Sequence, residues 1–402
     1  MTPYRNRRLA AVYHCLTPNG LFHLPFRQPS LANLLIVQIF FLLFIVSCAR
    51  VGTPVGWPAG VIASDTLYIG TQDGEIRAVN IGPNADDLLL AQWTRVLGTE
   101  DDLVSVYGTP AVSGEFLYIG GYDGRLYSIL ISSGELNWQE KVSSSGESIV
   151  GSPVVNNSLV FVGSSDGNLY ALEKIDGFEK WRFETGNKIW STPVVNEGIV
   201  FFGSLDQHLY AVTIENGAEK WRFKANGGIA TPPIITNGNV HFGAFDSVFY
   251  AIDIESGREE WKFEGANNWF WARPAVADNT VYVASLDGNL YALGTEDGRV
   301  RWLFSTESPI IGSPAIVGDN IAIPSKDNGI FLVRLRDGEI QDQCAIDGSL
   351  RASLTVHGNV IYFSDDNHTI RSLEVNRDRN LVEGWELHTS ESVDEFSRWK
   401  CG

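Results

Sequence analysis

The chain has 402 residues, with 48 acidic side chains against 30 basic ones and a formal net charge of −18. A surface of that sign repels phosphate backbones, which excludes nucleic acid as an expected partner. Forty glycines and an aromatic content of 11% exclude a disordered chain and favour an all-β protein. The four cysteines form no CxxC pair, which excludes a disulfide-dense scaffold and the usual zinc-binding patterns.

The N-terminal segment has the pattern of an export signal. Residues 34–46 form an apolar run in which Gln38 is the only polar residue, and the earlier basic residues include Arg27. A bilayer-spanning helix needs about 20 apolar residues, so this run is too short to span comfortably. A short apolar run behind a basic flank is typical of a secretory signal.

The run ends in Ile45-Val46-Ser47-Cys48, which resembles the bacterial lipobox. The resemblance implies that Cys48 is acylated, becomes the new N-terminus and anchors the protein to a membrane. Residues 1–47 are then a lipoprotein signal peptide with an extended basic region, and residues 48–56 are a lipidated linker. The alternative is an uncleaved membrane anchor that contains an incidental cysteine.

A repeat organises the rest of the chain. An acidic or amide residue marks a turn before each apolar LYAL-like run, and successive markers are 40 to 50 residues apart. The markers are Asp73, Asp123, Asp166, Asp206, Asp246, Asp287, Asp327 and Asn367. A tryptophan follows five of them after fifteen residues, namely Trp138, Trp181, Trp221, Trp261 and Trp302. The first copy reaches Trp93 after an insertion and the eighth reaches Trp385, whereas the seventh copy has Asp342. Eight copies of one unit therefore fill residues 57–389, followed by a tail at 390–402.

Each unit predicts four short antiparallel strands. Residues 191–223, for example, contain four apolar runs separated by NEG, LDQ and ENG turn signals. One such meander leaves a face unburied, so the copies are expected to stack and close into a ring. The predicted fold is an all-β, eight-bladed β-propeller, and the repeated tryptophans are expected to pack against neighbouring blades.

Residues 166–181 and 287–302 resemble the pyrroloquinoline-quinone (PQQ) repeat with its tryptophan-docking motif. The resemblance implies an eight-bladed propeller, a fold shared by quinoprotein alcohol dehydrogenases and by non-catalytic BamB-like lipoproteins. Those dehydrogenases bind PQQ over two adjacent cysteines and coordinate calcium, but no two cysteines adjoin here. His241 and the other histidines show no metal-binding spacing. The expectation is a protein without an enzymatic activity, cofactor or metal; PQQ with calcium is the disfavoured alternative.

Candidate binding residues lie where the chain passes from one unit to the next. Three residues before the first-strand proline, or before Gly60 and Leu354 in the first and last copies, stand Trp57, Tyr107, Val150, Trp190, Ala230, Trp271, Ile311 and Arg351. Arg273 and Trp269 lie beside this set. Aromatic residues and arginine are typical of recognition hot spots, so a binding funnel is predicted here, with residues 267–271 as its most irregular part. The alternative is that these rings only pack between blades.

Two insertions in the first repeat, residues 82–90 and 97–106, mix acids with leucines that we expect to be exposed, as in partner-docking loops. The alternative is that they are only chance differences in loop length. Cys344 and Cys401 are the only cysteines left once the chain is cut at Cys48. Export permits a disulfide between them, which would fasten the tail to the seventh blade and let Trp399 fill the space left by its missing tryptophan. The alternative is two unrelated free thiols.

The function predicted from these features is that of a membrane-tethered envelope scaffold that binds proteins, with a BamB-like role in outer-membrane protein assembly. The expected location is the periplasmic side of the outer membrane or the outer face of the cytoplasmic membrane. The first alternative is an envelope receptor for a small anionic or carbohydrate ligand in the funnel. The second is a PQQ-dependent dehydrogenase.

Overall fold

A computed structural model describes residues 59–71, 74–82, 91–99, 102–143, 145–389 and 395–401. The predictions for the signal peptide, Cys48, Trp57, the linker and most of the first insertion lie outside these residues. In the described part no helix is long and apolar enough to cross a membrane.

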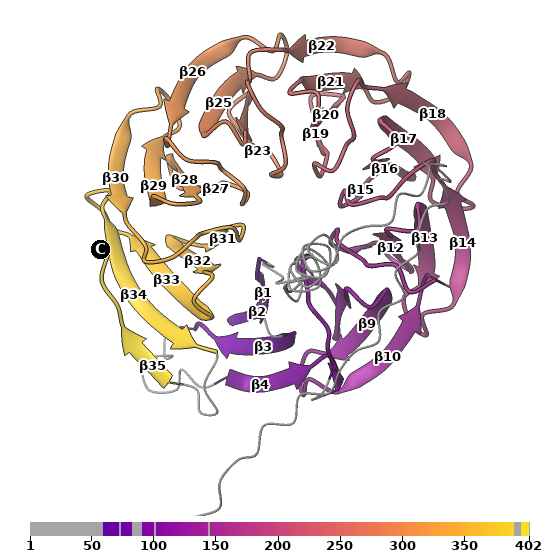
Figure 1. Cartoon of the computed structure of the whole chain (residues 1–402), viewed down its shortest axis with the longest axis horizontal. Helices are drawn as coiled ribbons and strands as arrows, with labels where there is room; N and C mark the ends of the chain where they lie inside the picture. Colours follow the sequence, from indigo (N-terminus) through magenta and orange to yellow (C-terminus); the bar gives the residue numbers. More distant parts are fainter. Residues whose placement is uncertain are drawn as a thin grey trace, which may run out of the picture. The chain divides into compact units, whose positions relative to one another are not determined.

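Eight antiparallel sheets follow one another along the chain, each a meander of four consecutive strands. They surround a central axis, with the first strand of each sheet innermost and the fourth at the perimeter (Figure 1). The prediction of an all-β, eight-bladed propeller is confirmed.

The first four blades have the following strands. Blade one contains β1 (Val61–Ala63), β2 (Thr66–Gly70), β3 (Glu75–Asn80) and β4 (Ala91–Val96); blade two contains β7 (Ala111–Ser113), β8 (Phe116–Gly120), β9 (Arg125–Leu130) and β10 (Leu136–Lys141); blade three contains β11 (Val154–Val155), β12 (Leu159–Gly163), β13 (Asn168–Glu173) and β14 (Glu179–Glu184); blade four contains β15 (Val194–Asn196), β16 (Ile199–Gly203), β17 (His208–Thr213) and β18 (Glu219–Lys224). The pair β5 (Gly98–Thr99) and β6 (Asp102–Leu103) forms a small hairpin between blades one and two.

The second four blades continue the same pattern. Blade five contains β19 (Ile234–Thr236), β20 (Asn239–Gly243), β21 (Phe249–Asp253) and β22 (Glu259–Phe263); blade six contains β23 (Ala275–Ala277), β24 (Thr280–Ala284), β25 (Asn289–Gly294) and β26 (Val300–Ser305); blade seven contains β27 (Ala315–Val317), β28 (Asn320–Ser325), β29 (Gly329–Arg334) and β30 (Ile340–Cys344); blade eight contains β31 (Thr355–His357), β32 (Val360–Ser364), β33 (Thr369–Val375) and β34 (Leu381–His388), to which the tail adds β35 (Glu395–Arg398).

Blade four illustrates why the unit folds in this way. Its two middle strands are buried along most of their length because neighbouring blades cover both faces, whereas the outer strand β18 alternates between exposed and partly buried residues. The register places Phe201, Ala211 and Trp221 in one row across the blade. The small alanine between the two rings brings their centroids to 5.6 Å.

The ring closes between the last blade and the first. Thr355 of blade eight donates its hydroxyl hydrogen to the carbonyl oxygen of Gly60 over 2.7 Å. Leu67 and Ile69 of blade one form one apolar cluster with Tyr362 and Ile370 of blade eight. The described parts of these two blades are therefore held together mainly by the burial of apolar area.

Candidate functional site

The repeated tryptophans connect each blade to the next. The indole N–H of each one donates to a carbonyl oxygen of the following blade, at 2.8–3.2 Å, in the pairs Trp93–Ile131, Trp138–Lys174, Trp181–Ile214, Trp221–Ile254, Trp261–Thr295 and Trp302–Leu335. Trp385 lies in the cluster that joins blades eight and one. In blade seven, Asp342 makes the connection differently, because its carboxylate accepts the backbone N–H of Leu381 at 2.7 Å. The repeated tryptophans and Asp342 therefore have a structural role, which is to connect neighbouring blades.

The acidic turn residues have a structural role as well. In blade four the carboxylate of Asp206 accepts the Tyr210 hydroxyl at 2.7 Å and the backbone N–H of His208 at 3.0 Å. Burial and this carboxylate raise the pKa of Tyr210. The same aspartate–tyrosine pair recurs in blades two, three, five and six at 2.6–2.7 Å. Because this aspartate–tyrosine pair recurs in five blades, we assign it the role of stabilising the turn rather than a role in catalysis.

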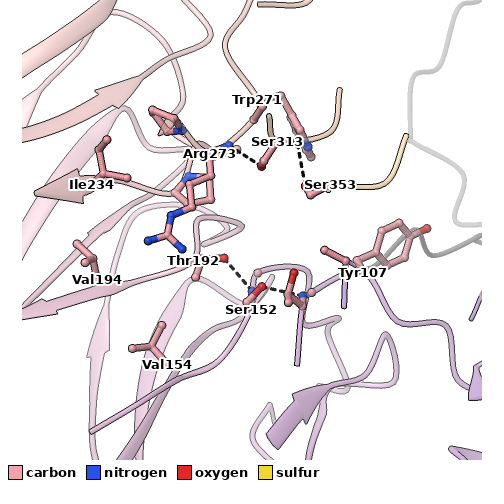
Figure 2. A pocket seen from close by; sticks show the side chains of 18 of the residues that line it. Tyr107, Ser152, Val154, Thr192, Val194, Ile234, Trp271, Arg273, Ser313 and Ser353 are labelled. Carbon is pink, nitrogen blue, oxygen red and sulfur yellow. Dashed lines mark hydrogen bonds between the residues drawn. The ribbon is translucent and has the colours of Figure 1, made fainter. Parts of the chain in front are cut away.

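A cavity of about 890 Å³ lies at the centre of the ring and is lined by first-strand and connection residues of all eight blades. Its walls form three successive layers that follow the chain as it enters each blade. The first layer contains Tyr107, Trp190, Trp271 and Arg351; the second contains Ser152, Thr192, Arg273, Ser313 and Ser353; the third contains apolar strand residues such as Val154, Val194 and Ile234. Figure 2 shows members of all three layers around the opening.

The first layer brings together four of the predicted funnel residues, Tyr107, Trp190, Trp271 and Arg351. The rings of Trp190 and Trp271 lie on blades four and six, yet their centroids are 6.1 Å apart in an edge-to-face arrangement. Blade five has only Ala230 at the equivalent position, which lets the two indoles meet. The Trp190 indole N–H also donates to the Ser165 hydroxyl at 3.0 Å.

Trp269 lies outside the cavity wall and is 47% exposed. It stacks on Phe245, with centroids 4.7 Å apart, and Phe245 in turn stacks on Trp271 at 5.8 Å. We call Trp269, Phe245, Trp271 and Trp190 the aromatic ladder. Sequence reasoning missed Phe245, although the repeat contained a signal: the turn of blade five has Phe245 where blades four and six have leucine.

Of the second-layer residues, only Arg273 was predicted from the sequence. A hydroxyl in one blade accepts a backbone N–H from the preceding blade at 2.8–3.0 Å, in the pairs Thr109–Ser152, Ser152–Thr192, Arg273–Ser313 and Ser313–Ser353. We call Ser152, Thr192, Ser313 and Ser353 the hydroxyl ring. The signal in the sequence was a serine or threonine directly before the first-strand proline, or before Leu354 in the last copy.

Arg273 is the one charged side chain in the second layer. Its side chain is open to the cavity and points toward the side that carries Thr192 (Figure 2). The surrounding walls displace bulk water, and this burial lowers the pKa of the guanidinium. Arg351, in the first layer, instead faces Asp366 at 3.5 Å.

The lining does not fit PQQ with calcium. Calcium is bound by oxygen ligands, among which carboxylates are prominent, and the described residues of the cavity wall include no aspartate or glutamate. The described residues also hold no group of three or more His, Cys, Asp or Glu side chains placed to bind a metal. His241 is fully buried in a strand of blade five, away from the cavity.

The second insertion of the first repeat differs from the expectation. Leu97, Val104 and Val106 are buried and belong to the apolar cluster between blades one and two. The expectation of exposed leucines in this segment is wrong for Leu97. Because β5 and β6 fold the insertion into a hairpin, its apolar ends are directed into the core.

The tail joins two blades. Strand β35 pairs with β34 of blade eight, and Cys401 forms a disulfide with Cys344 at the end of β30 in blade seven, their Cα atoms 5.0 Å apart. Trp399 is buried in the apolar cluster that contains Cys344 and Phe363. The tail thus supplies a ring at the one blade interface where the repeated tryptophan is missing.

An eight-bladed ring with tryptophan docking in seven blades and a central cavity defines the class of PQQ-repeat β-propellers. Within this class, the model of the outer membrane protein assembly factor BamB family matches residues 55–183, 146–244, 176–268 and 243–395. These matches extend over most of the sequence. The chain belongs to the BamB family.

Solved structures agree on the fold. BamB from Moraxella catarrhalis aligns with 77% of this chain and 93% of its own, with a TM-score of 0.66 and 18% identity. The computationally designed Ika8 protein aligns with 74% of this chain and 96% of its own, with a TM-score of 0.60 and 16% identity. No curated protein matches the sequence.

Proposed function

We propose that this protein is an envelope lipoprotein that binds partner proteins during outer-membrane protein assembly. Family membership supports this role, since the matching family is described as an outer membrane protein assembly factor. The observation that carries the proposal is the exposed end of the aromatic ladder. Trp269 is a large ring, half exposed and held rigidly against Phe245, which is the geometry of a recognition hot spot.

The ladder lies on one face of the propeller, which we call the connection face. This face contains the turns between second and third strands and the connections between blades. Tyr122, which is 40% exposed and 5.3 Å from Tyr107, lies in such a turn of blade two. Exposed rings on two parts of one face, around an acidic protein, suit a partner surface with apolar pockets and basic groups.

Affinity purification from detergent-solubilised envelopes tests this role. We expect wild-type protein to retain outer-membrane assembly components and Trp269→Ser to lose them. The matched control is Phe178→Ser, which removes a 71% exposed ring from the turn between β13 and β14, at the opposite face. Equal recovery of partners by wild type and Trp269→Ser would contradict a docking role for this ring.

Membrane tethering through Cys48 is part of the proposal. Two or three acyl chains would hold the protein firmly, since each buried methylene contributes about 0.8 kcal/mol. Metabolic labelling with palmitate should mark wild type but not Cys48→Ser. Detection of residues 1–47 on the mature protein would contradict cleavage at this cysteine.

A further inference from the structure

The central cavity differs in charge from the protein around it. The whole chain has a formal net charge of −18, yet the described residues that line the cavity include two arginines and no acidic side chain. Arg351 is paired with Asp366, whereas within the described ranges no carboxylate lies within 4 Å of Arg273. A cation in a partly dehydrated cavity attracts an anion strongly, and a guanidinium suits a carboxylate because it donates two parallel hydrogen bonds.

Besides Arg273, the second layer contains four hydroxyl groups that can donate hydrogen bonds. Each member of the hydroxyl ring already accepts one backbone N–H, so its own hydrogen remains available for an acceptor. Among the described residues, none of these four hydroxyls donates a hydrogen bond. A ligand that fills this layer should therefore be rich in acceptor oxygens.

The first layer supplies a flat apolar surface directly beside these donors. Trp271 precedes Arg273 by two residues, so their Cα atoms are at most about 7 Å apart. The ring of Trp190 is inclined at 61° to that of Trp271, so the two indoles form a corner. A suitable ligand thus combines one flat C–H face with a carboxylate and further oxygens within a short distance. Its volume is compatible with a cavity of about 890 Å³, which falls in the usual range for ligand sites.

We propose that the central cavity binds a sugar acid, with the pyranose face on Trp271 and Trp190 and the carboxylate on Arg273. The hydroxyl ring donates to the sugar oxygens. A hexuronate has its carboxylate attached to the ring itself, which matches the short separation between the two layers. Trp269, which carries the partner surface proposed above, lies outside the cavity wall, so substitutions at Trp269 and at Arg273 test the two proposals separately.

The test uses the purified full chain and D-glucuronate as the probe, followed by tryptophan fluorescence and ligand-observed NMR. Glucose lacks the carboxylate and acetate lacks the ring, and we expect each to bind at least about tenfold more weakly than glucuronate. Arg273→Gln should weaken glucuronate binding by at least about tenfold, and Arg273→Lys should restore part of the loss. The matched control is Arg299→Gln, which removes an exposed arginine at the perimeter paired with Asp297.

Thermal unfolding of each variant shows whether it is folded. Thr192→Val is a second, uncharged substitution in the same layer, and it should also weaken glucuronate binding.

Several results would overturn the proposal. Acetate binding as tightly as glucuronate would indicate a simple anion site, and trialanine binding more tightly would indicate a peptide terminus. Unchanged binding in Arg273→Gln, or no binding of glucuronate by wild type, would also overturn it. None of these results depends on recovery of partner proteins.

Discussion

Trp221 donates its indole N–H to the carbonyl oxygen of Ile254 in the next blade over 3.1 Å. This bond crosses from blade four to blade five, and equivalent bonds cross five other blade boundaries. Each blade is a marginal sheet by itself, so a side chain that is anchored in two blades couples their stabilities.

We expect Trp221→Ala to lower the free energy of unfolding by about 3–5 kcal/mol, because it empties an aromatic site and leaves a backbone carbonyl without its donor. Trp269→Ala is the control, since that ring is half exposed, and we expect a loss of about 1 kcal/mol or less. Urea denaturation followed by circular dichroism measures both. Comparable losses would show that the division into structural and recognition rings is wrong.

The glycine that faces Trp221 allows a paired test of docking. A Cβ atom added at Gly257 would lie 2.7 Å from the Trp221 ring, whereas one at Gly238 would meet nothing within 4 Å. Both glycines have positive φ, 69° and 75°, so alanine should cost each of them about 1–2 kcal/mol of backbone strain. We expect Gly257→Ala to cost at least about 1 kcal/mol more than Gly238→Ala in the same denaturation assay. Equal costs would indicate that the ring moves aside freely.

The disulfide between Cys344 and Cys401 closes a loop with a sequence separation of 57 residues. On the chain-entropy model its removal should lower stability by about 4 kcal/mol, so Cys401→Ser should unfold at lower denaturant concentration. Wild type in reducing buffer should match the variant. Alkylation of denatured but unreduced protein, followed by mass spectrometry, measures the bond directly, and modification of both cysteines would refute it.

Because His241 is buried, we expect the protein to lose stability as the pH falls. It lies beside Trp261, and burial lowers the pKa of its ring to about 4, an effect that the Thr236 backbone partly opposes. The unfolded chain has the higher pKa, about 6.5, so it binds more protons than the folded chain between pH 6.5 and pH 4. Stability associated with the neutral ring is therefore complete above pH 6.5 and falls by about 3 kcal/mol as the pH approaches 4.

The variant His241→Phe should remove this part of the pH dependence, since phenylalanine occupies the equivalent strand position in blade four as Phe201. Chemical denaturation at pH 7 and pH 4.5 measures the difference. Parallel losses in wild type and variant between these two pH values would assign the acid sensitivity to other groups.

Local sequence patterns were sufficient to predict the eight blades, their turns, the docking tryptophans and the approximate position of the funnel. These features depend on residues close together in the chain, such as the turn at Asp206 and the strand that contains Trp221, and the repeat presents them several times.

Only the tertiary structure determined which funnel rings are in contact. Trp190 meets Trp271 because blade five offers Ala230, and Phe245 enters the ladder from a different turn. It also decided that Leu97 is buried and that the hydroxyl ring lines the same cavity as Arg273. Such contacts join segments of different blades, and their geometry is set by closure of the ring, which no local periodicity encodes.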